Sequence, residues 1–284
     1  MENLIETTGL CKRYEDFSLE GVNLTVPAGT IVGLIGENGA GKTTTLKAIL
    51  GAIRIDGGAV EVLGGSAQDK AVRAQIGIVF EDAFFYETMT PLQVGKSLAG
   101  IQPAFDRQHY AELLARFDLP GKKVIKDMSR GMRMKLRLAA ALAPRPRLLL
   151  LDEATSGLDP VMRGEILDML RDYIQDEAHS VLISSHITSD LEKIADSIVY
   201  IQRGKVLFQM DKDRLLEEYG VVRCSADELS RLPAGLVVAK RKGAFAMEAL
   251  VKDRAEANLW LRGAVVDKAS VEDIMQFYAG RETK

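Results

Sequence analysis

The segment at residues 36–43 limits what this chain can fold into more than any other feature. It reads G-E-N-G-A-G-K-T and matches G-x-x-x-x-G-K-[ST], the pattern of loops that hold phosphate groups between a strand and a helix. An apolar β-rich stretch, residues 30–35, comes before it, and residues 44–50 follow with helical spacing. Its glycines let the backbone wrap around an anion, so that N–H groups and a helix N-terminus point at the phosphates. The sequence therefore predicts a strand, a phosphate-binding loop and a helix, in that order.

Two side chains of this loop have predicted tasks. Lys42 is expected to reach the β- and γ-phosphates of a nucleoside triphosphate, and the Thr43 hydroxyl is expected to bind Mg²⁺. The alternative is a glycine-rich turn before a helix, which the full pattern and its context disfavour. We assign the loop and the residue after it to nucleotide binding: Gly36, Glu37, Asn38, Gly39, Ala40, Gly41, Lys42, Thr43 and Thr44.

The composition is that of a soluble globular protein. The chain has 284 residues, of which 47% are hydrophobic and 27% charged, and a net charge of −3. It therefore has no global basic field that would favour nucleic acid. Cys11 and Cys224 lie far apart without metal-ligand spacing, which indicates a reducing compartment. No apolar run approaches the roughly 18 to 20 residues that cross a bilayer, and the acidic, polar start is unlike a secretion signal. We expect a cytoplasmic chain that binds no nucleic acid.

Strands alternating with helices predict an α/β fold with a mostly parallel sheet. Expected strands cover residues 4–26 (antiparallel), 30–35, 60–63, 76–80, 147–151, 181–184 and a hairpin at 198–209 that turns at Arg203-Gly204. Expected helices cover residues 44–50, 70–75, 91–98, 107–117, 131–142, 161–174, 189–195 and 271–278. Beyond about Tyr219 the expected strands and helices become short and are interrupted by Pro233 and Gly235, so we place a domain boundary near Gly220.

Two carboxylates end the most apolar of these strands. Residues 148–151 are all leucine, and Asp152 and Glu153 follow, at the edge where α/β folds build their sites. An aspartate there can hold Mg²⁺, and Glu153 is free to deprotonate an attacking water. Acids end many strands, but an upstream phosphate-binding loop favours the functional interpretation.

With both elements in place, the chain resembles the ATP-binding subunits of ABC transporters. Residues 128–132, M-S-R-G-M, stand where that family has its L-S-G-G-Q signature, and residues 156–159, S-G-L-D, resemble its D-loop. His186 is similar to the family's switch histidine, and Tyr14 to the aromatic residue that stacks on adenine. The resemblance covers residues 4 to about 209.

The resemblance implies ATP and Mg²⁺ as ligands, with Glu153 as catalytic base and His186 as γ-phosphate sensor. It also implies a sandwich of two chains around two nucleotides, so that Ser129, Gly131 and Asp159 act on ATP held by a second ATP-binding subunit, in a homodimer or a heterodimer. An integral membrane permease is the implied partner, which would place the chain on the inner face of the membrane.

The implied architecture is a P-loop NTPase fold of ABC type. It combines the parallel core sheet with an antiparallel β subdomain and a helical subdomain. Residues 1–219 would form the ATP-binding domain, with the helical subdomain at about 87–143. Residues 220–284 would form a small α+β accessory domain.

Three of these residues also have plain structural interpretations. Ser129 precedes a helix and suits an N-cap. His186 alone is more often a satisfied structural histidine. Tyr14 is an aromatic residue that packs well against any sheet.

The chain departs from the family pattern at three positions. Glu81 stands where the family has a glutamine; its carboxylate can bind Mg²⁺ but cannot offer amide donors. Arg130 replaces the first signature glycine and lies either near a phosphate or in solvent, while Met132 replaces glutamine. Hydrolysis is still expected, because the other assigned groups are intact: Lys42, Thr43, Asp152, Glu153 and His186.

The residues of these motifs are similar to those of bacterial ATPases of the export branch, which pair with membrane proteins that handle antibiotics, peptides or polysaccharides. Two alternatives stay open: a weakly hydrolysing nucleotide-binding regulator, and a soluble ABC ATPase not coupled to transport. The aromatic segment 84–86 is a candidate surface for docking the membrane partner. Residues 240–243 are expected to form a solvated hairpin turn, and His109 and His179 to lie on the surface.

Overall fold

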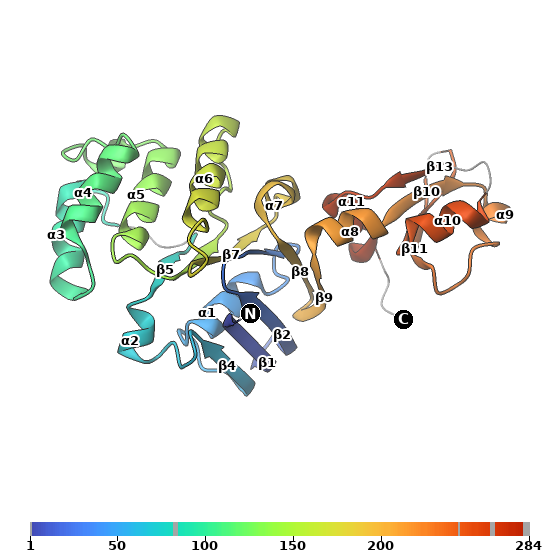
Figure 1. Cartoon of the computed structure of the whole chain (residues 1–284), viewed down its shortest axis with the longest axis horizontal. Coiled ribbons are helices and arrows are strands. Elements are labelled where there is room, and N and C mark those ends of the chain that lie inside the picture. Colours follow the sequence, from blue (N-terminus) through green and yellow to red (C-terminus); the bar gives the residue numbers. More distant parts are fainter. Residues whose placement is uncertain (1, 82–84, 244, 262–264, 281–284) are drawn as a thin grey trace.

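The computed structural model describes residues 2–81, 85–243, 245–261 and 265–280 (Figure 1). The N-terminal elements are β1 (Asn3–Arg13), β2 (Ser18–Pro27), β3 (Ile31–Ile35), α1 (Lys42–Ile49), β4 (Gly57–Val62), α2 (Lys70–Arg73) and β5 (Ile76–Val79). The middle elements are α3 (Pro91–Ile101), α4 (Arg107–Arg116), η1 (Ile125–Asp127), α5 (Arg130–Leu142), β6 (Leu148–Asp152), α6 (Pro160–Tyr173), β7 (Ser180–Ser185) and α7 (Thr188–Ile194). The C-terminal elements are β8 (Ser197–Gln202), β9 (Lys205–Asp211), α8 (Lys212–Glu218), β10 (Gly220–Cys224), α9 (Ala226–Leu229), β11 (Val237–Lys242), β12 (Met247–Val251), α10 (Arg254–Trp260), β13 (Val265–Lys268) and α11 (Val271–Ala279).

The central sheet has the strand order β5-β6-β7-β3-β8-β9. Only β9 runs antiparallel, as the second strand of the hairpin predicted from the sequence. Its turn residues Arg203 and Gly204 both have positive φ, at 46° and 76°. Every residue of β3, β6 and β7 is buried, as expected for parallel strands covered on both faces. The α/β prediction is confirmed.

Antiparallel strands form a second sheet, β2-β1-β4, which confirms the prediction for residues 4–26. Side chains of this sheet, such as Leu24 and Val62, share one apolar cluster with Leu46 and Ile49 of α1 and with Leu150 of the central sheet. Helix α1 is therefore held between the two sheets, and this fixes the loop before it.

Helices α3, α4 and α5 gather at one end of the molecule (Figure 1), within the stretch predicted to be helical. Their starts follow from local sequence: Thr90 forms a capping box with Gln93 before Pro91, and Asp106 and Ser129 cap α4 and α5. Among the described residues, none of the helices combines the length and apolarity that crossing a bilayer requires.

The basic run at residues 240–243 lies mostly in a strand and not in a turn, although residues 240–242 are exposed as expected. Lys240 to Lys242 belong to β11, and the Gly243 N–H donates to the Ala246 carbonyl at the hairpin end. Arg241 donates to the Glu248 carboxylate at 2.8 Å, and its guanidinium lies 4.4 Å from the centroid of the Phe277 ring. The Arg241 side chain remains exposed and lies over the buried Phe277 ring, where a long cationic side chain can cover apolar surface.

The two histidines expected on the surface are half-buried. The ring of His179 stacks on Tyr173 with centroids 4.6 Å apart, and the Nδ1 atom of His109 is buried without a hydrogen bond to any described residue. Both lie in a cleft of about 510 Å³ among α4, α6 and the loop after α5. Tertiary packing, which local sequence does not report, buries them.

The sheet β11-β12-β10-β13 is joined to the rest of the chain through α11. Val271, Ile274 and Phe277 belong to the same apolar cluster as β6 and β7. The Tyr200 hydroxyl donates to the Met275 carbonyl at 3.4 Å, and burial raises the pKa of Tyr200 to about 12. The Val271 N–H donates to the Glu192 carboxylate on α7 at 2.6 Å. Residues after Gly220 therefore contribute to the main core.

Removing the Phe277 ring from the contact between α11 and the main core should destabilise the protein. We expect Phe277→Ala to lower the free energy of unfolding by about 3 to 5 kcal/mol, because Phe277 is buried in the main cluster and its loss leaves a cavity. The matched control is Phe245→Ala, since Phe245 is fully exposed; its effect should stay within about 0.5 kcal/mol. Chemical denaturation followed by circular dichroism measures both. Equal effects of the two substitutions would contradict the shared core.

Candidate functional site

The loop at residues 36–43 joins β3 to α1, as predicted. Gly39 and Gly41 have φ of 79° and 111°, conformations that favour glycine. A Cβ on Gly36 would lie 2.4 Å from the Ile201 carbonyl oxygen, and one on Gly41 would lie 2.8 Å from the ring of Phe17. Gly41 is also the N-cap of α1 and provides no side-chain acceptor. The first N–H groups of α1 are therefore left to face whatever the loop holds.

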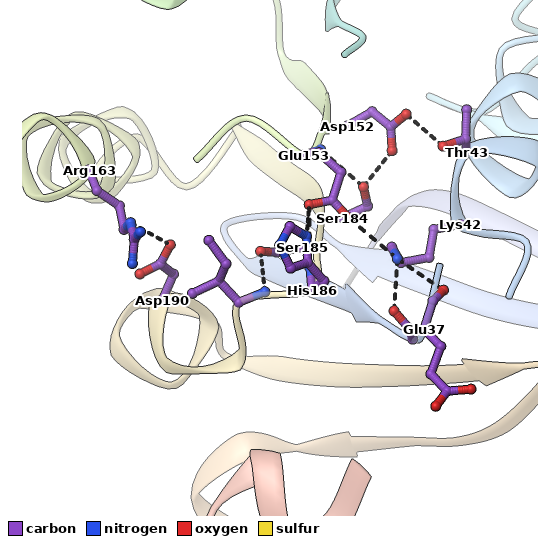
Figure 2. A network of polar contacts seen from close by, with 12 residues as sticks. Glu37, Lys42, Thr43, Asp152, Glu153, Arg163, Ser184, Ser185, His186 and Asp190 are labelled. Carbon is purple, nitrogen blue, oxygen red and sulfur yellow. Dashed lines mark hydrogen bonds and ion pairs between the residues drawn. The ribbon is translucent and has the colours of Figure 1, made fainter. Parts of the chain in front are cut away.

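Lys42 lies at the centre of the loop and is 6% exposed. Its Nζ donates to the carbonyls of Gly36 at 2.7 Å and Glu37 at 3.3 Å, and it lies 3.4 Å from Glu153 Oε1 (Figure 2). Loop and strand β6 thus fix the ammonium group between them. An anion in the loop would meet a cation that is already positioned.

Asp152 and Thr43 meet at the end of β6. The Thr43 hydroxyl donates to Asp152 Oδ2 at 2.7 Å, and the Ser184 hydroxyl donates to Asp152 Oδ1 at 2.5 Å. Asp152 pairs with Ser184 across the parallel strands β6 and β7. Two hydroxyl groups therefore orient the two carboxylate oxygens of the buried Asp152, and the bond from Thr43 holds Asp152 beside the phosphate loop.

Glu153 leaves the strand in an unusual conformation. Its φ is 52°, a left-handed value that few non-glycine residues adopt, and it is 8% exposed. Its N–H faces the carbonyl and hydroxyl of Ser184, at 3.1 and 3.2 Å. The turn directs its carboxylate between Lys42 and His186 (Figure 2).

His186 completes this group from the end of β7. Its Nδ1 lies 2.6 Å from Glu153 Oε2, and its backbone N–H donates to the same oxygen at 3.4 Å. Its side chain is nearly half exposed, so the ring is held on one side and open on the other.

Tyr14 lies on the turn between β1 and β2 and is 49% exposed, so it does not pack against the sheet. Lys12 Nζ lies 5.4 Å from the centroid of the Tyr14 ring, and the backbone N–H of Tyr14 donates to the Phe17 carbonyl. Since Phe17 packs against Gly41, this turn borders the phosphate loop. The remaining predicted loop residues divide by exposure: Glu37 and Asn38 are exposed, Thr44 is half-buried, and Ala40 is buried.

Three predicted residues are not brought to this group. Among the described residues, no hydrogen bond or ion pair links Ser129, Gly131 or Asp159 to residues 36–43. Ser129 caps α5 by accepting from the Met132 N–H, and Asp159 caps α6 by accepting from the N–H groups of residues 161 and 162. A Cβ on Gly131 would lie 2.8 Å from the side chain of Met162, so a larger residue there would displace Met162 of α6.

Glu81 and Arg130 have clear positions. Glu81 is exposed after β5, and its carbonyl accepts from Arg137 Nη1 at 3.3 Å; no hydrogen bond in the described part of the chain joins its carboxylate to Thr43 or Asp152. Arg130 is exposed and its guanidinium rests on Gly157 of the same chain. Burial lowers the pKa of Arg137, and so do the charges of Arg130 and Arg133. One face of α5 therefore carries a line of cations.

Sequence reasoning missed three residues around this site. Ser184 positions Asp152, and Arg163 and Asp190 form an ion pair between α6 and α7 with Nε and Oδ2 3.6 Å apart. A polar Ser-Ser pair that ends an otherwise apolar strand was the available signal for Ser184. The ion pair joins residues 27 positions apart, and no local pattern indicates it.

Comparisons with known proteins agree with this geometry. The family model described as ABC transporter matches residues 19–156. The chain is 34% identical over 211 residues to the ABC transporter ATP-binding protein YtrB of Bacillus subtilis, covering 74% of this chain and 72% of the relative. It is also 34% identical to the bacitracin transport ATP-binding protein BcrA of Bacillus licheniformis, covering 76% and 72%.

A solved structure of an ATP-binding subunit of an ABC transporter superposes with a TM-score of 0.67 at 29% identity. The match covers 75% of this chain and 91% of that one. Both comparisons reach the same conclusion as the loop, the acidic strand end and the histidine. The chain belongs to the family of ABC transporter ATP-binding proteins, the ATP-hydrolysing subunits of these transporters.

Proposed function

We propose that Glu153 is the general base of ATP hydrolysis in this chain, with Lys42 on the phosphates and His186 as the residue that senses the γ-phosphate. The observation that carries this proposal is the position of the Glu153 carboxylate, 3.4 Å from the Lys42 ammonium and 2.6 Å from His186 Nδ1. A base needs a partner that orients it and a cation that fixes the reacting phosphate beside it. These contacts supply both.

The oxygen donors near the loop suit Mg²⁺. Thr43 and Asp152 offer a hydroxyl and a carboxylate already in contact, and the described residues contain no group of three or more acidic, histidine or cysteine side chains around a common point. Mg²⁺ keeps several waters and takes one or two protein oxygens together with substrate phosphates. When bound, it would neutralise charge on the phosphates. Glu81 is an additional acid at the adjacent strand end that such an ion could reach.

We further propose that two copies of this chain enclose two ATP molecules. Each copy carries a phosphate loop and, separately, the N-terminus of α5, where Ser129 is exposed and Gly131 is buried in the first turn. That helix start can hold an anion, and no contact in the described structure brings it to its own loop. A symmetric pair would place Ser129, Gly131 and the Asp159 loop of one copy opposite the loop of the other. Tyr14 would then stack on the adenine.

The same proposal assigns residues 1–219 to the ATP-binding domain and residues 220–284 to an accessory unit. It also includes a membrane permease as partner and export across the membrane as the transport direction. A groove of about 210 Å³ runs beside Ile78, Phe85, Leu98 and Arg137. Tyr86 next to it is 81% exposed, whereas Phe84 lies outside the described residues. This apolar groove with a cationic edge suits a cytoplasmic segment of the permease, which would hold the chain at the inner face of the membrane.

The metal assignment is tested through Ser184. We expect Ser184→Ala to raise the Mg²⁺ concentration for half-maximal ATP hydrolysis about tenfold, because loss of an orienting partner weakens metal sites by about 10- to 100-fold. The matched control is Ser185→Ala, since Ser185 bonds the Ile187 N–H instead of Asp152. Hydrolysis measured across a Mg²⁺ titration gives the result. An unchanged Mg²⁺ curve for Ser184→Ala would contradict the assignment.

A further inference from the structure

Asp190 is a buried carboxylate that the proposed chemistry does not use. It lies in the first turn of α7, four residues after His186, and is 1% exposed. Neither of its oxygens accepts a hydrogen bond from any described residue. Burying such a group costs free energy unless a cation compensates it. Its ion-pair partner is Arg163 of α6, with Nε 3.6 Å from Oδ2 (Figure 2).

Arg163 also reaches the loop between β6 and α6. Its Nη2 donates to the Leu158 carbonyl at 3.4 Å, and Leu158 precedes Asp159, the N-cap of α6. The guanidinium therefore connects α7 with the last part of the loop that begins at Glu153. One arginine thus contacts two segments that enter the site from different strands.

These contacts form a closed path that passes through Glu153 and His186. The chain runs from Glu153 along residues 154–158 to the Leu158 carbonyl, and from there through Arg163 to Asp190. The first turn of α7 leads from Asp190 back to His186, whose Nδ1 meets Glu153 at 2.6 Å. Because this path is closed, a shift of the loop or of α7 would be transmitted to the contact between His186 and Glu153.

We propose that Arg163 and Asp190 are a positioning pair, which sets the distance between His186 and Glu153 and ties it to the placement of the 156–159 loop. This inference rests on the proposed roles of Glu153 and His186. Neither Arg163 nor Asp190 is proposed to touch the nucleotide. A misplacement of reacting groups by about 1 Å can cost about 100-fold in rate, so turnover depends on the pair while ATP binding does not.

The test separates positioning from stability. Replacing a buried ion pair by apolar residues of similar volume is often neutral or stabilising, so the double variant Arg163→Met/Asp190→Leu should keep the thermal midpoint of the wild type. We expect its kcat to fall about 10- to 100-fold, with KM for ATP within about twofold. The control is Arg171→Met, because Arg171 also joins α6 to α7, by donating to the Lys193 carbonyl at 2.8 Å, but at the far end. Its kcat should not change.

A second comparison applies if the double variant does not fold. Asp190→Asn keeps the shape and removes the charge, whereas Asp190→Glu keeps the charge and extends toward Arg163. We expect kcat to fall about tenfold for the asparagine variant, on the same positional argument, and to remain within about twofold of wild type for the glutamate variant. Wild-type kcat in a folded double variant, or equal kcat for the two single variants, would overturn the proposal.

Glu153→Gln in the same assay keeps the two proposals distinguishable. If this variant hydrolyses ATP at the wild-type rate, the assigned chemistry fails. If it is inactive while the folded double variant is fully active, only the positioning role fails.

Discussion

Glu153→Gln should lower ATP turnover by about 10²- to 10⁴-fold, the range in which a general base contributes. Glutamine has nearly the same size, so it fills the place between Lys42 and His186, but it cannot accept a proton. ATP binding should persist, because the loop and Lys42 are unchanged. Steady-state hydrolysis together with equilibrium binding of ATP measures both effects.

The control is Glu165→Gln. Glu165 also pairs with a lysine, with Lys135 Nζ 2.6 Å from its carboxylate, but on the exposed side of α6. Turnover of Glu165→Gln should remain within about twofold of wild type, since Glu165 pairs with Lys135 and not with Lys42 or His186, and an ion pair with one partner half exposed contributes little. Wild-type turnover in Glu153→Gln, with Glu165→Gln also active, would exclude Glu153 as the base.

The second large effect concerns the start of α5, which among the described residues makes no hydrogen bond or ion pair with residues 36–43. Ser129→Asp should block ATP-driven pairing of two chains, because a carboxylate would meet the γ-phosphate held by the other copy. Aspartate is as good an N-cap as serine, so α5 should keep its start. Ser129→Asn is the matched control: it preserves the cap without the charge, and we expect it to pair.

Much of this fold follows from local sequence. Four leucines before Asp152 predict a strand buried on both faces, and the structure buries all of β6. The glycines of the phosphate loop and the Pro91 start of α3 likewise have local causes. The predictions failed where side chains from distant segments decide the outcome. The exposed Arg241 lies over the Phe277 ring, and His179 stacks on Tyr173; neither contact has a periodic signal.

The site divides in the same way. Lys42, Thr43, Asp152 and Glu153 were assigned from motifs, because the chemistry of a phosphate loop requires those residue types at those places. The conformation of Glu153, with φ of 52°, was not foreseen, since it arises from bonds to Ser184 on another strand. Arg130 is a further case. The sequence allowed its side chain to lie either near a phosphate or in solvent, and in the structure its guanidinium contacts Gly157.

We expect ATP to be held between two chains, each completing the site of the other. The most direct measurement is the mass of the Glu153→Gln chain in solution by light scattering, with and without ATP and Mg²⁺, since this variant should bind ATP without consuming it. We predict the 31.1 kDa mass of one chain without nucleotide and twice that mass with it. The additional Ser129→Asp substitution should keep the single-chain mass, and Ser129→Asn should not. A Glu153→Gln chain that is saturated with ATP and still has the mass of one chain would contradict the claim.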